Sequence, residues 1–441
     1  MYSSYDILST VTAPALGCTE PAAIALSAAA AATLLEGQSI TAIELTLDPN
    51  IYKNAMGVLI PGSGGRCGIE LASAMGAVGG DASRKLQTLT SVGEAELARA
   101  DVLLSEGRVQ THLDKDRSEL YIRTEIHTEA GTVEATVGGL HDRVVELRRN
   151  GEPVTEHPLL PDSSGGGDPV AELEQWLREQ SFASLMQLAV ELTPEAEELV
   201  RQGVEYNTAL ADYGLEHATG LGVGASIAEA VEAGIMSDDL ITAARRIAAA
   251  ASDARMGGAP LPAMSSSGSG NHGIVATNVV AAAARQLRSG DRVMLEAVSI
   301  AHIATAYIKA HTGRLSALCG TAVAAGAGAA AGIVHLRGGH TDQMASAVTN
   351  VIEDLAGIAC DGAKASCALK VATGAGSAVQ AAMLAAADRR VPGSEGIVSD
   401  EVEQTVRNLG RLSKPGMVET DRTILGIMMD EEARRAEAAA G

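Results

Sequence analysis

Aromatic side chains are scarce in this sequence, and so are cysteine and long apolar runs. Only 2% of the 441 residues are Phe, Trp or Tyr, whereas 46% are hydrophobic. The cores must therefore be built from Ala, Val, Ile and Leu, and the 48 glycines allow helices to pack closely. A chain of this length can form two or three domains with sizeable cores.

The start of the chain and its apolar runs predict neither export nor a membrane span. MYSSYDILSTVTAPALG lacks the basic region and the apolar run of a secretory signal. The most apolar runs, such as AVAAGAGAAAGIV at 322–334, fall short of the roughly 18 to 20 residues that cross a bilayer. We therefore expect a soluble cytoplasmic protein without a membrane partner.

The charge of the chain is strongly acidic. Its 55 acidic and 33 basic residues give a formal net charge of −22. This surplus repels nucleic acid and anionic lipid surfaces, so neither is expected as a partner. An anionic substrate must then be held by local features of the molecule.

The first third of the chain combines helix and strand patterns. A helix between Pro21 and Gly37 is predicted by a proline suited to a first turn, a run of alanines and a capping glycine. Apolar runs predict strands at 40–48 and 56–60. The Val-, Ile- and Thr-rich alternation at 107–149 predicts an antiparallel meander.

A domain boundary is predicted at 151–168, which gathers Pro, Gly, Ser and Asp without periodicity. We therefore expect an α/β (α+β) domain with a small sheet at 1–150 and an all-helical domain at 169–441. The Ala-rich helices of the second domain favour a homo-oligomer, but they do not fix the number of subunits. Gly-rich segments interrupt these helices at 220–226, 265–273 and 310–320.

Three of the five cysteines lie in the expected helical domain, at Cys319, Cys360 and Cys367. Their spacing fits no zinc ribbon, because no close CxxC pair is present. In a reducing compartment, three thiolates can hold three irons of a cubane cluster and leave the fourth iron open as a Lewis acid. The alternative is that these cysteines are small buried side chains, as free cysteines often are.

Cys18 lies at the mouth of the first predicted helix. The helix dipole and the free backbone N–H groups favour a thiolate there, while the nearby Glu20 opposes it. A thiolate suits a nucleophile or a base, and a structural cysteine is the alternative. Cys67 has no partner nearby in sequence and is interpreted as a packing residue.

Two glycine-rich loops are candidates for binding an anion. SSSGSGNHG at 265–273 offers hydroxyls, an amide, an imidazole and glycines that let backbone N–H groups converge on a carboxylate. PGSGG at 61–65 offers a second such loop. Neither matches a nucleotide-binding signature, and tight turns between packed helices are the alternative for both.

Five motifs in the same order carry a family resemblance: ALGCTEPAAIAL, NIYKNAMGVLIPGSG, SSGSGNHG, AHTGRLSALCG and CDGAKASCALK. Together they resemble the iron-sulfur L-cysteine desulfidase family, which is related to the alpha chain of iron-sulfur L-serine dehydratase. The resemblance implies a 4Fe-4S cluster held by Cys319, Cys360 and Cys367, and Cys18 as the base. The sequence departs from the family at Thr321, where a further cysteine is common, and at Cys67, which is extra.

The activity implied by the resemblance is β-elimination of L-cysteine to sulfide, ammonia and pyruvate, by a carbon-sulfur lyase that needs no pyridoxal phosphate. Cys18 would take the Cα proton, and the open iron would bind the leaving sulfur. The site is expected between the two domains, and an exposed iron predicts inactivation by oxygen. The predicted substrate contacts are Asn54 and Lys53 from the first domain and Ser267, Gly268, Ser269, Asn271 and His272 from the second.

Two other functions remain open. Iron-sulfur L-serine dehydratase, in which the same cluster expels hydroxide, is the nearest, together with β-elimination of another small amino acid. This chain lacks the GPSSSHT-type opening of the serine dehydratase beta portion, and its GCTEP opening favours cysteine. From a different class, the protein could be a non-catalytic iron-sulfur sensor.

Overall fold

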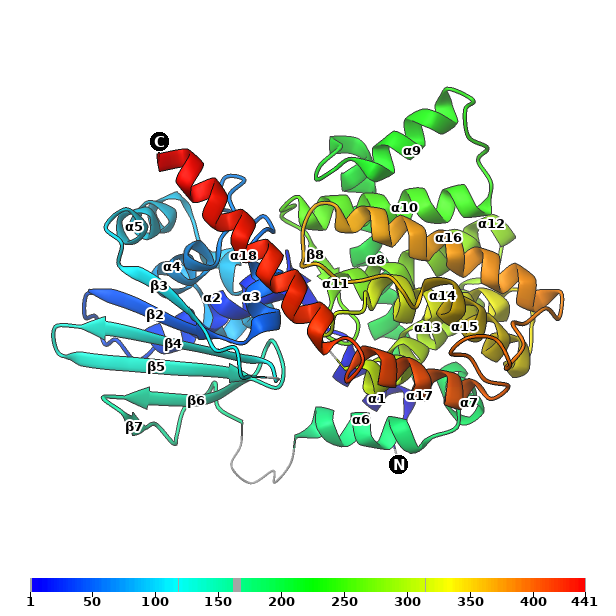
Figure 1. Cartoon of the computed structure of the whole chain (residues 1–441), viewed down its shortest axis with the longest axis horizontal. Coiled ribbons are helices and arrows are strands. Elements are labelled where there is room, and N and C mark those ends of the chain that lie inside the picture. The colour runs from blue at the N-terminus through cyan, green and yellow to red at the C-terminus, as the bar shows by residue number, and fades with distance from the viewer. Residues whose placement is uncertain (1, 118, 162–167, 314, 441) are drawn as a thin grey trace.

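The computed structural model describes residues 2–117, 119–161, 168–313 and 315–440. The chain forms a sheet part and a helical part that lie side by side (Figure 1). Each part has its own apolar core, one beneath the sheet and one among the helices. This arrangement confirms the predicted fold class.

The sheet has six strands in the order β3-β2-β4-β5-β6-β7. Its strands are β2 (Ala42–Leu47), β3 (Val109–Leu113), β4 (Tyr121–Thr128), β5 (Gly131–Gly138), β6 (Val144–Arg149) and β7 (Glu152–Pro153). Strands β4 to β7 pair antiparallel with their neighbours, as the meander predicted. The prediction is wrong for β3, which runs parallel to β2. A parallel neighbour requires a crossover, and the helices between β2 and β3 provide it.

Helices cover one face of the sheet. They are α2 (Thr19–Ala32), α3 (Pro49–Ala55), α4 (Ile69–Gly79), the 3₁₀ segment η1 (Ala82–Ser91) and α5 (Glu94–Ser105). The strand predicted at 56–60 is wrong, because only Leu59 forms an isolated bridge, with Cys67. The segment before it is helical: Pro49 occupies the first turn of α3, and the Asp48 carboxylate accepts hydrogen bonds from the N–H groups of Asn50 and Ile51.

The helical part begins at Pro169. Its helices are α6 (Pro169–Glu179), α7 (Phe182–Val190), α8 (Pro194–His217), α9 (Val223–Glu232), α10 (Leu240–Met256), α11 (Gly270–Ile274), α12 (Val280–Leu287), α13 (Asp291–Thr312), α14 (Gly326–Leu336), α15 (Thr341–Leu355), α16 (Cys367–Ala386), α17 (Val402–Ser413) and α18 (Val418–Ala440), with π-helical segments η2 (Val275–Val279) and η3 (Thr321–Ala325). Contrary to the sequence expectation, α13 is long and apolar enough to cross a membrane. However, 83% of its apolar window is buried inside the protein, so it is a core helix.

Both ends of the chain cross between the two parts. Helix α1 (Ser4–Val11) packs in the helical core, and β1 (Pro14–Leu16) pairs antiparallel with β8 (Pro262–Met264). Helix α18 runs from the helical part toward the sheet part (Figure 1). Strand β7 lies inside the linker predicted at 151–168, of which 162–167 lie outside the described residues. The domain boundaries therefore stay a prediction.

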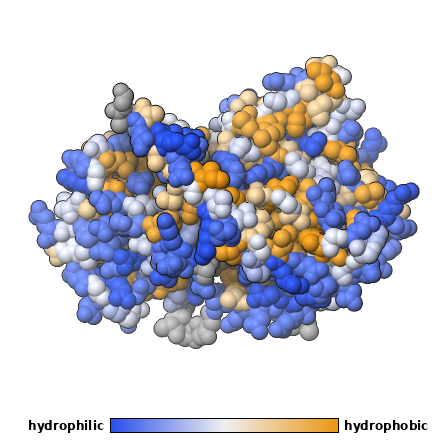
Figure 2. All heavy atoms as spheres, viewed as in Figure 1, coloured by the Kyte–Doolittle hydropathy of each residue, from blue (hydrophilic) through white to orange (hydrophobic). Residues whose placement is uncertain are grey.

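The two parts differ on the face that Figure 2 shows. Hydrophilic side chains dominate over the sheet part, whereas hydrophobic side chains gather over the helical part. Exposed large apolar residues include Leu369 and Leu384 on α16 and Ile235 after α9. The expectations of a homo-oligomer and of no nucleic acid partner remain predictions.

Candidate functional site

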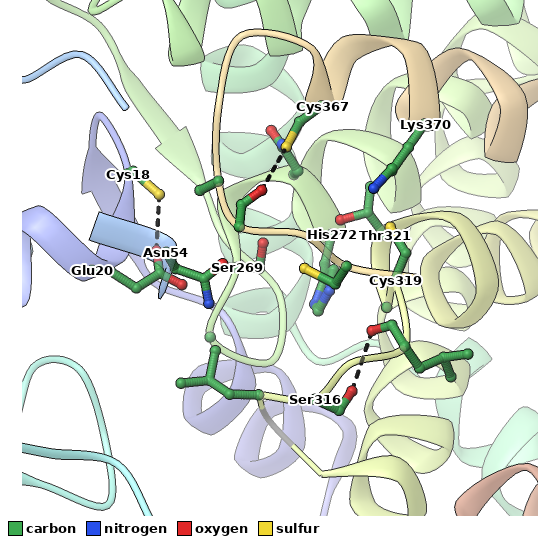
Figure 3. A pocket seen from close by; sticks show the side chains of 18 of the residues that line it. Cys18, Glu20, Asn54, Ser269, His272, Ser316, Cys319, Thr321, Cys367 and Lys370 are labelled. Atoms are coloured by element: carbon green, nitrogen blue, oxygen red, sulfur yellow. Dashed lines mark hydrogen bonds between the residues drawn. The ribbon is translucent and has the colours of Figure 1, made fainter. Parts of the chain in front are cut away.

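One small cavity lies where the two parts meet, with a volume of about 80 Å³. It is far smaller than a pocket for a drug-sized ligand, so it suits a small molecule. Figure 3 shows Cys18, Cys319 and Cys367 around it. The predicted site residues on its wall are Cys18, Asn54, Gly268, Ser269, Asn271, His272, Cys319, Cys360 and Cys367.

Two predicted substrate contacts, Lys53 and Ser267, are absent from this wall. The Lys53 side chain is 1% exposed and forms an ion pair with Asp421 of α18. It lines a second, larger cavity of about 750 Å³ beneath α18. Lys53 therefore links α3 to the C-terminal helix instead of facing a substrate in the small cavity.

The serine-rich loop before α11 is held by the N-terminal segment. The N–H of Ser265 donates to the Ala13 carbonyl (2.8 Å), and the N–H of Ser267 donates to the Val11 carbonyl (2.7 Å). Ser267 adopts a left-handed conformation with φ of 47°, which is strained for a residue with a side chain. A segment far away in the sequence thus holds this loop in place beside the cavity.

A short two-stranded bridge positions two of the three cysteines predicted to bind the cluster. Leu318 pairs antiparallel with Ala359. On one side of this pair the N–H of Cys319 donates to the carbonyl of Ile358 (2.9 Å), and on the other side the N–H of Cys360 donates to the carbonyl of Ala317 (2.6 Å). Because successive side chains alternate between faces, Cys319 and Cys360 both point away from the face of the bridged pair. Two cysteines that are far apart in sequence therefore share one face.

The third cysteine, Cys367, is the first residue of α16. Lys370, one turn further along, donates to the carbonyl of Ala359 (2.7 Å) and pairs with Asp361. Burial raises the pKa of both Cys319 and Cys367, and the positive charge of Lys370 offsets part of this rise. Such a cation offsets part of the negative charge that thiolates carry when they bind metal.

Burial is the main influence on the thiol of Cys319. Burial and the neighbouring Cys360 raise the pKa, the N–H of Ala322 opposes them, and the result is a pKa of about 12. The thiol is therefore protonated until a metal displaces the proton.

The donor set fits an iron-sulfur cluster. Soft thiolates are the ligands that such clusters use, and all three line the same cavity. Within the described part of the chain, no three His, Cys, Asp or Glu side chains lie close enough to chelate a single ion. A cluster distributes its ligands over separate irons, so its three thiols need not lie close enough to chelate one ion.

Cys18 forms the N-cap of α2 and is 4% exposed. Its Sγ lies 2.8 Å from Oε2 of Glu20, as the dashed line in Figure 3 marks. Burial raises the pKa of Cys18, Glu20 raises it further, and Arg255 lowers it. Burial and the opposing effect of Glu20 therefore outweigh the helix dipole, and the resting group is a thiol that donates to Glu20. Nε2 of His141 lies 4.0 Å from the other oxygen of Glu20.

His272 is neutral in this site. Burial, together with the positive charges of Lys309 and Arg255, lowers its pKa to about 3. Its Nδ1 lies 3.1 Å from the carbonyl oxygen of Ser266, so Nδ1 carries the proton and donates. Its Nε2 is then a lone-pair acceptor. It lies so close to Gly320 that a Cβ at this glycine would be 2.7 Å from it.

Several wall residues were missed from the sequence. They are Arg255, Lys309, Ser316, Thr321 and Lys370, while Glu20 was considered only as an influence on Cys18. Arg255 stands at the end of the Ala-rich helix α10 and is 2% exposed. No motif surrounds it, and a lone arginine in a helix is normally read as a surface residue.

Comparison with known families matches residues 122–426 to the serine dehydratase alpha chain. A UPF0597 protein of Desulfatibacillum aliphaticivorans is 46% identical, covering 97% of this chain and 98% of its own. Those of Desulfotalea psychrophila and Clostridioides difficile are 47% and 38% identical, covering 97% and 96% of this chain and 98% and 99% of their own. These matches confirm the resemblance to iron-sulfur serine dehydratase alpha chains, and the chain belongs to the serine dehydratase alpha chain family.

Proposed function

We propose that this protein is an iron-sulfur-dependent lyase that eliminates the β-substituent of a small amino acid, with L-cysteine as substrate. The products would be sulfide, ammonia and pyruvate. The observation that carries the proposal is the convergence of Cys18 and three further cysteines on one small cavity. The family supports a lyase of this type, because a serine dehydratase removes a β-substituent from an amino acid.

Cys319, Cys360 and Cys367 would hold a 4Fe-4S cluster, which supplies an open Lewis-acidic iron for the leaving sulfur. The proposed reaction needs no pyridoxal phosphate. The protein contributes one buried and two half-buried thiols, the compensating charge of Lys370, and a small cavity beside them.

Cys18 would act as the base at Cα. Since its resting thiol carries a proton, it must lose this proton before it can accept another. Oxygen Oε2 of Glu20 lies 2.8 Å away and is the nearest acceptor for it. The proton taken from Cα then occupies the sulfur, and Glu20 would give its proton to the departing sulfide, so each turnover moves one proton through the Cys18–Glu20 pair.

The loop before α11 would orient the substrate. Gly268 and Ser269 line the cavity beside Asn271 and the neutral His272. Asn54 of α3 faces them from the sheet part. Donors and acceptors fixed in this way can hold a small polar substrate without reorganising during the reaction.

The first experiment measures sulfide and pyruvate release from L-cysteine by anaerobically reconstituted protein, with iron determined on the same sample. We expect equal release of both products. Cys18→Ala should keep its iron and lose the release, whereas Cys360→Ser should lose iron as well. Cys67→Ala is the matched control, because Cys67 is exposed and lies outside the cavity. Full release by protein shown to be free of iron would contradict the proposal.

The second candidate, L-serine dehydratase, is favoured by the family match itself. Turnover of L-serine and L-cysteine by one preparation separates the two, since faster turnover of L-serine would assign dehydration. A loaded cluster with no release from either amino acid, and Cys18→Ala without effect on any property, would indicate a sensor. Oxygen sensitivity and a cytoplasmic location remain predictions.

A further inference from the structure

The guanidinium of Arg255 is buried in the cavity wall with part of its hydrogen-bonding capacity unused. Its Nη1 donates to Oδ1 of Asn271 (3.1 Å) and contacts the sulfur of Met256 (3.4 Å). Its Nε and Nη2 have no hydrogen-bond partner among the residues that the structure describes. A buried cation with unsatisfied donors is unfavourable, so these atoms are expected to serve a ligand.

The two unused nitrogens form a single edge of the guanidinium. The N–H groups of Nε and Nη2 point in parallel, a spacing that matches the two oxygens of a carboxylate. Asn271 holds Nη1 and so fixes the plane of the group. Gly270 lies directly beside this edge and only a glycine fits there, because a Cβ at that position would lie 2.2 Å from Nε.

The charges around the cavity also favour an anionic ligand. Among the described residues, its wall carries three cationic side chains, Arg255, Lys309 and Lys370, of which Lys370 already pairs with Asp361, and one carboxylate, that of Glu20. Glu20 already accepts hydrogen bonds from Cys18 and Thr19. Within the described ranges, no carboxylate oxygen lies within 4.0 Å of Arg255 to form an ion pair.

We propose that Nε and Nη2 of Arg255 bind the α-carboxylate of the substrate side-on, and that Asn271 acts as the positioning residue for the guanidinium. This assignment rests on the proposed function for the identity of the ligand as an amino acid. It restricts the substrate to a small molecule with a free carboxylate, and it places the Cα of the bound molecule between Arg255 and Cys18. Amides and decarboxylated amines would be excluded.

The test uses two unreactive probes on anaerobically reconstituted protein. L-Alanine keeps the amine and the carboxylate, whereas L-alaninamide has a neutral amide in place of the carboxylate. Calorimetric titration should show that the wild type binds L-alanine more tightly. Arg255→Lys, which keeps the charge but loses the paired donors, should weaken L-alanine binding on the order of 100-fold and abolish the preference. Its KM for L-cysteine should rise, with iron content unchanged.

Arg246→Lys is the matched control, because Arg246 is another arginine of α10 and pairs with Asp238 (3.3 Å) outside the cavity. It should bind both probes as the wild type does. An Arg255→Lys variant that binds L-alanine normally would overturn the proposal, and so would a wild type that binds both probes equally. Equal binding of the two probes by the wild type would overturn the proposal even if Arg255→Lys fails to fold.

The same measurements keep the two proposals apart. If the wild type releases no product from L-cysteine or L-serine, the proposed function fails. Probe binding still tests Arg255, since binding a carboxylate does not require elimination. If the wild type is active and Arg255→Lys is equally active and equally selective, the assignment of Arg255 alone fails.

Discussion

The buried pair of Cys18 and Glu20 makes an unusual prediction for Glu20→Gln. Glutamine keeps the size of the side chain and can still accept a hydrogen bond from the thiol, but it carries no charge. Since Glu20 is one of the groups that raise the pKa of Cys18, its neutralisation should lower that pKa. The thiol should therefore react faster with an alkylating agent at a given pH.

The rate of elimination should fall in Glu20→Gln, although the thiol becomes more reactive. Glutamine cannot take the proton that passes over the 2.8 Å contact, so the proton-transfer contribution is lost. That contribution is typically on the order of 100- to 10,000-fold in rate, or about 3 to 5 kcal/mol in the barrier. A variant that is more readily alkylated and yet much less active would separate proton transfer from thiol ionisation.

The assay combines two readouts on iron-loaded protein. Product release gives the rate, and mass spectrometry of the Cys18 peptide gives the alkylation rate as a function of pH. Glu36→Gln is the matched control, because this glutamate is 66% exposed and pairs with Arg149 on the surface. Glu20→Gln with a full rate of elimination and a full complement of iron would refute the reasoning.

Two further predictions concern stability. Burial lowers the pKa of His302 to about 4, so the unfolded chain takes up the proton first as the pH falls below 6.5. The contribution of neutral His302 to the free energy of unfolding is present above about pH 6.5 and is lost as the pH falls toward 4. His302→Gln should remove this contribution, so the difference in unfolding free energy between pH 7 and pH 4 should shrink by roughly 3 kcal/mol. Urea unfolding at the two pH values measures it. An unchanged pH dependence would contradict the assignment. At Gly76, a Cβ would lie 2.3 Å from the carbonyl oxygen of Ala25, so Gly76→Ala should force α2 and α4 apart and cost about 2 kcal/mol, measured in the same way. A variant as stable as the wild type would show that the two helices can separate freely.

Local patterns accounted for much of the sheet part. The alternation in β2 places every second side chain in the core, which is the signal from which this strand was predicted. The partner of β3 could not be read in this way, because pairing depends on which helices intervene. The segment at 56–60 is apolar because it packs in the core, and apolarity alone does not distinguish a strand from a buried loop.

The candidate site likewise combines residues that local motifs predict with residues that only the folded structure identifies. The cysteines could be predicted because motifs marked them, although the bridge that pairs the segment of Cys319 with that of Cys360 is a tertiary contact. Lys53 was misassigned since its partner Asp421 lies 368 positions along the chain. Arg255 carried no local signal at all, because its meaning comes from burial and from unused donors, and both require the folded protein.

The pairing of β1 with β8 has a consequence for how this protein can be divided. The region that matches the family, 122–426, begins long after the backbone carbonyls of Val11 and Ala13 that hold the serine-rich loop. A fragment cut at those limits would lose α1 from its core and leave β8 with an open edge. The region 122–426 is therefore not expected to fold by itself. Any split or circularly permuted form of the enzyme would have to carry its first sixteen residues along with the helical part.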